Sequence, residues 1–128
     1  MNPPGVTIRA SNFSVKDTID RLIRFFEQHG VTIYARIDQQ AEAEKAGIKI
    51  HALEFVLFGN PKVGGPVMRE NPIVALDLPL KLIAWEDIEQ KVWYAFNNAN
   101  YLQERYSLSQ EMTNSLDISG VISKVQGF

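Results

Sequence analysis

Apolar residues recur at helical spacing after residue 14, and this is the clearest pattern along the chain. Ser14 can accept a hydrogen bond from an amide of the first turn, and Gly30 is typical of the position just after a helix end. The apolar stripe consists of Val15, Ile19, Leu22, Ile23 and Phe26. This spacing covers one face of a helix, so the pattern predicts an amphipathic helix over residues 15–29.

Alternation of apolar and polar residues predicts the strands. Residues 31–38 alternate strictly. Their even alternation predicts that Val31, Ile33, Ala35 and Ile37 face the helix, and that Thr32, Tyr34, Arg36 and Asp38 face away. Residues 53–58 are apolar on both faces except at Glu54, as in an interior strand. Further strands are predicted at 6–10, 73–77, 80–86 and 91–96, with a hairpin turn at 87–90.

Shorter helices complete the prediction. Asp38 can cap a helix over residues 39–46, which Gly47 would end. A helical turn is expected over residues 64–70, with Pro66 in its first turn, followed by a helix at 101–106. A C-terminal helix is expected at about 115–126. Runs of strands with helices at either end indicate an α+β fold, in which helices pack mainly on one face of an antiparallel sheet.

Composition narrows the classes of function. The chain has 128 residues, so we expect one domain over residues 1–128, and a net charge of −2 with no basic run argues against a nucleic-acid partner. There is no cysteine and there are only two histidines, so we expect no metal and no cofactor. No signal peptide and no membrane-spanning run is recognisable, so we expect a cytoplasmic protein without a membrane partner.

Several short motifs recur in a recognisable order between residues 11 and 108. They are Phe58-Gly59-Asn60-Pro61-Lys62, Leu76-Asp77-Leu78-Pro79-Leu80-Lys81, Trp85-Glu86-Asp87, Tyr101-Leu102 and Arg105-Tyr106. In this order and spacing, the chain resembles the domain-of-unknown-function family 302. The resemblance implies a TATA-binding-protein-like β-α-β(4)-α arrangement and a homodimer, but no reaction. Gln39 stands where relatives often have histidine, and Gly65 where they often have threonine.

Polar residues at predicted strand ends are the candidates for a ligand site. They are Asp38, Asn60, Lys62, Asp77 and Lys81. Asp38 is either a helix cap or a carboxylate at a cleft mouth, and Asn60 either satisfies its own turn or recognises a ligand. Lys62 precedes a glycine pair that is either a plain turn or an anion loop. Asp77 and Lys81 either form a surface ion pair or place a lysine against a ligand.

Three functions remain open. The first, which we prefer, is a non-catalytic homodimeric module that binds a small ligand, with anions among the candidates. The second is a hydrolase or isomerase whose acid–base site uses Asp38, His51 and Lys81, although His51 fits a packing role as well. The third is a partner-binding protein that uses the mixed aromatic and charged sheet face around Trp85, since such a face suggests a ligand groove or a subunit interface. No catalytic residue is assigned.

Overall fold

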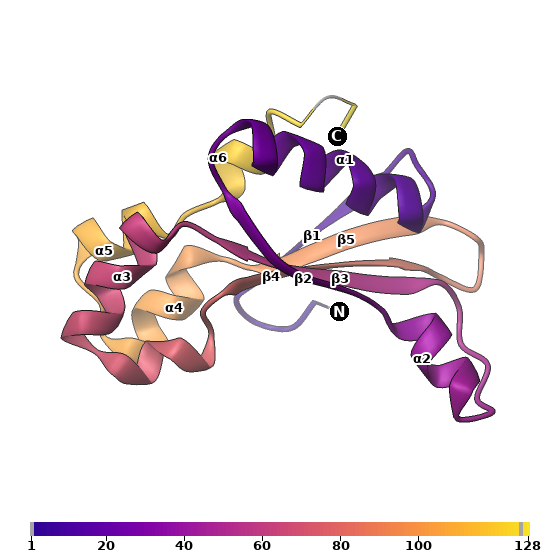
Figure 1. Cartoon of the computed structure of the whole chain (residues 1–128), viewed down its shortest axis with the longest axis horizontal. Helices are drawn as coiled ribbons and strands as arrows, with labels where there is room; N and C mark the ends of the chain where they lie inside the picture. Colours follow the sequence, from indigo (N-terminus) through magenta and orange to yellow (C-terminus); the bar gives the residue numbers. More distant parts are fainter. Residues whose placement is uncertain (1, 126) are drawn as a thin grey trace.

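Five strands form one antiparallel sheet in the computed structural model, which describes residues 2–125 and 127–128 (Figure 1). The strands are β1 (Val6–Ser11), β2 (Thr32–Asp38), β3 (Leu53–Gly59), β4 (Leu80–Glu86) and β5 (Val92–Asn97). Their order across the sheet is β1-β5-β4-β3-β2, and every neighbouring pair is antiparallel. The interior position predicted for residues 53–58 is therefore confirmed.

The helices are distributed over one face and both ends of the sheet (Figure 1). They are α1 (Val15–Gln28), α2 (Gln39–Lys45), α3 (Pro61–Glu70), the 3₁₀ helix η1 (Pro72–Leu76), α4 (Ala99–Tyr106), α5 (Gln110–Ser115) and α6 (Ser119–Ile122). Helices α1 and α6 cover one face. Helices α3, α4 and α5 form a lobe at one end of the sheet, and α2 leaves the other end. The α+β class is confirmed.

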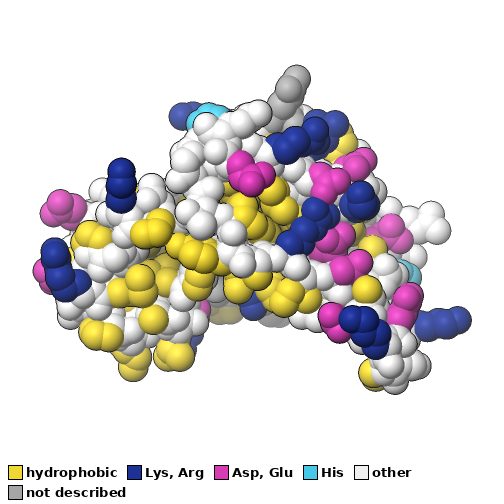
Figure 2. Space-filling view, in the orientation of Figure 1, with side chains coloured by type: hydrophobic (Ala, Val, Ile, Leu, Met, Phe, Trp, Pro, Cys, Tyr) yellow, Lys and Arg dark blue, Asp and Glu magenta, His cyan; other side chains and the backbone are white. Residues whose placement is uncertain are grey.

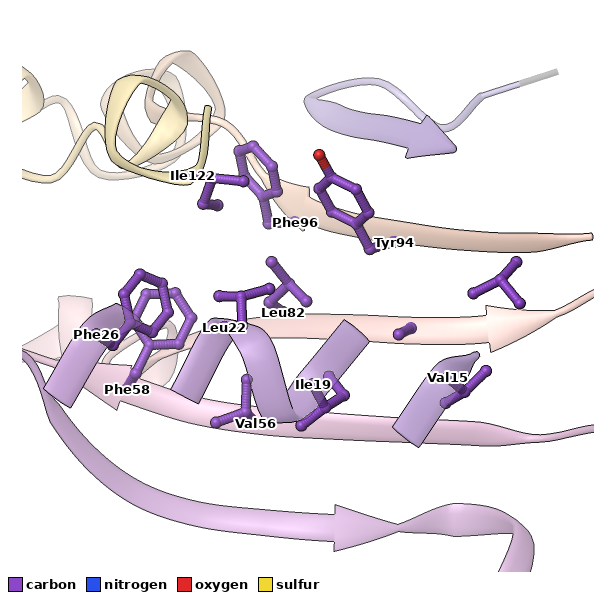
Figure 3. Packing of buried hydrophobic residues seen from close by; sticks show 12 residues of the cluster. Val15, Ile19, Leu22, Phe26, Val56, Phe58, Leu82, Tyr94, Phe96 and Ile122 are labelled. Carbon is purple, nitrogen blue, oxygen red and sulfur yellow. The ribbon is translucent and has the colours of Figure 1, made fainter. Parts of the chain in front are cut away.

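The main core lies between α1 and the covered face of the sheet. Ile19 and Leu22 of α1 are fully buried, and Figure 3 shows them beside Val56 and Leu82 of the central strands. Helix α1 begins as predicted, since the Ser14 side chain accepts a hydrogen bond from the Asp17 amide at 3.1 Å. A second core fills the lobe and consists of Val67, Val74, Leu102, Tyr106, Leu108 and Leu116.

The opposite face of the sheet carries no helix (Figure 1). Side chains alternate along a strand, so the neighbours of the core residues point to this side. We call it the open face and define it by Ile37, Leu53, Phe55, Ile83, Trp85 and Trp93. All six are partly buried, and they form two rows across the strands. Trp85 belongs to this face, which is the sheet face that the partner-binding alternative would use.

The facing predicted for the second half of β2 is wrong. The pairing with β3 shifts between Ile33 and Ala35, so Tyr34 is the extra residue of a β-bulge. One extra residue reverses the facing of every later side chain. Ala35 and Ile37 therefore lie on the open face, whereas Arg36 lies on the face that carries α1 and donates to Asp20 of that helix.

Two further elements differ from the prediction. Helix α3 begins at Pro61 rather than near Pro66, because the Asn60 side chain caps it and Pro61 suits its first position. The strand predicted at 73–77 is instead η1, held by i→i+3 hydrogen bonds such as that from the Val74 amide to the Asn71 carbonyl at 3.1 Å. The segment turns into the lobe, where Val74 is buried in the second core, and it pairs with no strand of the sheet.

The predicted C-terminal helix is shorter than expected. The helical conformation is interrupted after α5, and Asp117 accepts hydrogen bonds from the Ser119 amide and hydroxyl at the start of α6. Ile122 and Val125 are buried, while residue 126, at the expected end of that helix, lies outside the described residues. Among the described residues, no helix has the length and apolarity needed to cross a bilayer.

Candidate functional site

A cleft of about 420 Å³ opens between the α1–α6 layer and the lobe. The end of α1, the end of β3, the first turns of α3 and the connection between α5 and α6 line it. The space-filling view shows hydrophobic side chains gathered where the lobe meets the helix layer (Figure 2). The volume lies within the range of about 300–1,000 Å³ that small-molecule sites occupy.

The walls of the cleft are largely apolar. Phe26 and Phe58 stack at 4.5 Å between ring centroids and form the side nearest the main core. The lobe contributes Val63, Met68 and Leu78. The sequence explains this apolar lining. The apolar stripe of α1 and the apolar positions of β3 both extend to the end of the sheet where the two cores meet.

Asn60 supplies the best-placed polar group at the edge of the cleft. Its Oδ1 accepts a hydrogen bond from the Lys62 amide at 3.0 Å, which is the cap of α3. Among the described residues, no protein acceptor takes a hydrogen bond from its Nδ2. The cap therefore fixes the carboxamide while leaving its Nδ2 group available to donate to a ligand.

Tyr34 and Asp117 are the other distinctive polar residues of the lining. Tyr34 is 50% exposed and lies at the bulge of β2. Asp117 uses Oδ1 to bind the start of α6. The described lining residues include no lysine or arginine, so the cleft offers a hydrogen-bonding edge without positive charge.

Gly64 brings the α3 backbone to the cleft wall. A Cβ atom added there would lie 3.7 Å from Leu78 Cδ1 and 3.8 Å from Met68 Cε, which are ordinary contacts. Any longer side chain would extend into the cleft. Gly65, one residue later, meets nothing within 4 Å and is not part of the lining.

A second cavity of about 310 Å³ lies behind the segment 78–80, which lines both spaces. Asp77, Lys81 and Asn97 provide its polar groups. Asp77 Oδ2 accepts hydrogen bonds from the Tyr106 hydroxyl at 2.5 Å and from Arg105 at 3.1 Å. Burial, together with the hydrogen bond to Asp77, raises the pKa of Tyr106 to about 12.

Lys81 does not pair with Asp77. Its Nζ lies 4.6 Å from the centroid of the Phe55 ring, and it forms no ion pair with a carboxylate in the part of the chain that the structure describes. The surface pair considered for these two residues is therefore wrong, because Asp77 ends η1 and binds Arg105 instead.

The structure separates the candidate residues of the sequence. Asn60 lines the cleft, and Asp77 and Lys81 line the second cavity. Asp38 caps α2 through a 2.9 Å hydrogen bond from the Ala41 amide and lies about 20 Å from Asn60, at the opposite end of β2. Lys62 is exposed and lines neither space, and the glycine pair after it is helical rather than an anion loop.

The residues of the enzyme alternative are not brought together. Asp38 pairs with Glu54 and Lys81 pairs with Leu57, so their side chains leave opposite faces of the sheet. His51 is exposed in the segment before β3. In the described residues, no group of three His, Cys, Asp or Glu side chains is placed to hold a metal ion.

Tyr34 and Met68 line the cleft, and Arg105 and Tyr106 bind Asp77 of the second cavity, but none of these four was among the predicted site residues. Tyr34 was placed on an alternating strand, where nothing in the pattern marks a bulge. Arg105 and Tyr106 were noted as landmarks, but their contact with Asp77 spans 28 and 29 residues and depends on how the lobe packs.

The fold and its two cavities define a small α+β protein with an apolar cleft beside a single antiparallel sheet. The chain belongs to the family "Domain of unknown function DUF302", whose model matches residues 6–124. The fold is also similar to that of an uncharacterized conserved DUF302 protein from Bacillus stearothermophilus. The TM-score with that crystal structure is 0.79 at 16% identity, and the alignment covers 94% of each chain.

Longer proteins contain a related segment. The chain is 36% identical over 104 residues to a protein of Brucella suis biovar 1 (strain 1330) named "Fluoride-specific ion channel FluC 1". A protein of the same name from Brucella abortus biovar 1 (strain 9-941) matches equally well. The alignments cover 81% of this chain but only 41% and 38% of these relatives, so the chain spans about two fifths of their length.

Proposed function

We propose that this protein is a non-catalytic module that binds a small ligand in the cleft beside Asn60. The observation that supports it best is the apolar cavity of about 420 Å³ with a fixed carboxamide at its edge. Large apolar pockets with a few well-placed polar groups are the usual form of a small-molecule site.

The lining suggests the chemistry of the ligand. Apolar walls favour an aliphatic or aromatic body, because burying that body removes apolar surface from water. The free Nδ2 of Asn60 suits a carbonyl or hydroxyl oxygen. Asp117 adds negative charge, and the described lining has no cation to offset a ligand carboxylate. We therefore propose an uncharged polar end and set the anion reading aside for this cleft.

A binding role suits the lining better than catalysis. The titratable side chains among the lining residues are Tyr34 and Asp117. Asp117 binds the start of α6, and Tyr34 is half exposed. Nucleophilic catalysis needs a nucleophile within hydrogen-bond reach of a base, and this lining supplies no such pair of described residues.

The channel relatives favour a second candidate function. A segment like this chain forms part of proteins named as fluoride-specific ion channels. The chain would then act as an accessory module that contacts such a channel and makes it responsive to the ligand of the cleft. Co-purification of the chain with a fluoride channel from membranes tests this candidate, and loss of the channel in a high-stringency wash would count against it.

A thermal-shift screen of uncharged amphipathic compounds tests the ligand proposal. A ligand that binds only the folded state raises the melting temperature with concentration. Gly64→Leu is expected to abolish that rise, because its side chain fills the cleft. Gly65→Leu makes the same change in the same helix, away from the lining, and should leave it intact. Equal shifts in both variants would show that the compound binds elsewhere.

A further inference from the structure

The second cavity, of about 310 Å³, lies where the sheet meets the lobe. Leu57 and Lys81 are paired across β3 and β4, and Asn97 ends β5. Side chains alternate along a strand, so these three leave the sheet on the side opposite the core residues that flank them. Leu76 and Leu102 of the lobe add apolar walls. The volume falls at the lower end of the range of about 300–1,000 Å³ that small-molecule sites occupy.

Asp77 presents a fixed negative charge to this cavity. Its Oδ2 accepts hydrogen bonds from the Tyr106 hydroxyl and from Arg105, whereas no described residue donates to its Oδ1. The Asp77 side chain is only 17% exposed. The two donors hold the carboxylate in one orientation, and the remaining oxygen is an acceptor for a donor group of a ligand.

Lys81 presents the opposite charge. It lines the cavity and forms no ion pair with a carboxylate in the described part of the chain. Its Nζ lies 4.6 Å from the centroid of the Phe55 ring. A cation–π contact at an exposed site is weak, and the flexible stem of lysine lets the ammonium group turn from the ring to a ligand carboxylate.

The cavity thus carries two opposite charges that do not neutralise each other. A ligand with only one charged group would satisfy either Asp77 or Lys81 and leave the other unpaired. A ligand that carries both an ammonium group and a carboxylate satisfies the two together. Asn97, whose carboxamide can both donate and accept, adds a neutral contact. The cleft beside Asn60 has no cation among its described lining residues, so this chemistry belongs to the second cavity alone.

We propose that the second cavity binds a small aliphatic amino acid. The ammonium group of the ligand donates to Asp77 Oδ1, and its carboxylate accepts from Lys81. Its side chain packs against Leu57, Leu76 and Leu102, because burial there removes apolar surface from water. The site is separate from the cleft of the proposed function, and the proposal does not depend on what the cleft binds.

Titration of the isotope-labelled full chain with L-leucine, followed by NMR, tests the proposal. Saturable shifts are expected at the amides of Asp77, Lys81 and Asn97. Isocaproate lacks the ammonium group of leucine and isoamylamine lacks its carboxylate, so each should bind about tenfold more weakly. The absence of a saturable shift at millimolar leucine would overturn the proposal, as would analogues that bind as well as leucine. Shifts confined to Asn60 and Lys62 would also overturn it, because they would place leucine in the cleft.

Variants that remove one charge assign the two ends of the ligand. Lys81→Met should weaken binding of leucine and isocaproate about tenfold and leave isoamylamine unchanged. Asp77→Asn keeps an oxygen for the Tyr106 hydroxyl and should weaken leucine and isoamylamine instead. Lys91→Met is the matched control, since Lys91 also lies over a ring, 4.4 Å from the Trp93 centroid, but outside the cavity. It should leave all three affinities unchanged. Equal weakening of both analogues by each cavity variant would overturn the proposal, because it would show that the variants act through the fold.

Discussion

Asp77 and Tyr106 are joined by a hydrogen bond of 2.5 Å although 29 residues separate them in the sequence. The bond ties the end of η1 to the last residue of α4. Arg105, the neighbour of Tyr106, donates to the same carboxylate oxygen. These contacts fix the segment 77–80, which forms the wall between the cleft and the second cavity.

Tyr106→Phe is expected to destabilise the protein by about 1.5–2 kcal/mol, because hydrogen bonds to charged groups contribute about that much. Tyr106 is only 9% exposed, so the ring stays packed and the change isolates the hydroxyl. Urea unfolding followed by circular dichroism measures the effect. Tyr101→Phe in the same helix, whose hydroxyl binds Arg105 rather than Asp77, is the control and should cost less. Equal losses of stability in the two variants would show that the hydrogen bond to Asp77 contributes no more than the one to Arg105.

The same residue predicts a loss of stability in alkali. Tyr106 has a pKa of about 12 in the folded protein against an ordinary value of 10.0. The unfolded chain therefore loses this proton first, so the contribution of Tyr106 is complete below pH 10 and falls as the pH rises to 12. The melting temperatures of wild type and Tyr106→Phe, measured across this range, should converge. A constant difference between them would contradict a raised pKa.

The sequence predicts elements well where a local pattern is sufficient. The stripe of α1, the cap at Ser14 and the interior strand β3 were all predicted from periodicity. The bulge at Tyr34 was not, because strict alternation through residues 31–38 conceals the extra residue. Residues 73–77 were assigned to a strand because they form an apolar run. Such a run does not reveal how many of its residues are buried, and in η1 only Val74 is buried.

The sequence identifies candidate site residues at the ends of strands, but it does not show which of those ends lie together. Asn60 was recognisable because a polar residue before proline ends an apolar strand, and such ends carry sites. Asp38 ends a strand in the same way, but antiparallel pairing brings the start of β2, not its end, next to Asn60. The contacts of Asp77 with Arg105 and Tyr106 depend on the packing of the lobe, which no local pattern encodes.

Arg36 links two carboxylates across the edge of the sheet. It donates to Asp20 of α1 at 2.5 Å and to Glu54 of β3 at 2.8 Å, and the Glu54 side chain is only 11% exposed. Arg36→Met is expected to cost about 2–3 kcal/mol, because it leaves Glu54 poorly solvated and unpaired. Lys45→Met breaks the exposed pair with Glu42 and should cost at most about 0.5 kcal/mol. Denaturant unfolding of both variants makes the comparison.

Acid should reduce the cost of Arg36→Met. The hydrogen bond from Arg36 holds the pKa of Asp20 below its usual value of 3.8. A lowered carboxyl pKa contributes stability that is complete above the unfolded value and is lost as the pH falls through the folded one. The difference between wild type and variant should therefore shrink below pH 3.8. A difference that stays constant in acid would show that Arg36 acts through packing of its aliphatic stem.

Two variants of Asn60 separate its structural role from its proposed role in binding. Asn60→Ala removes the cap of α3 and is expected to cost about 1 kcal/mol of stability. Asn60→Asp keeps an oxygen that can accept from the Lys62 amide, so stability should stay close to wild type. It loses the Nδ2 donor, however, and adds a negative charge to the cleft that Asp117 also lines. A ligand found in the cleft should therefore bind Asn60→Asp at least tenfold more weakly, by isothermal titration calorimetry, although the protein is as stable as before. Unchanged affinity in this variant would mean that Asn60 serves the fold alone and that the cleft recognises its ligand by shape.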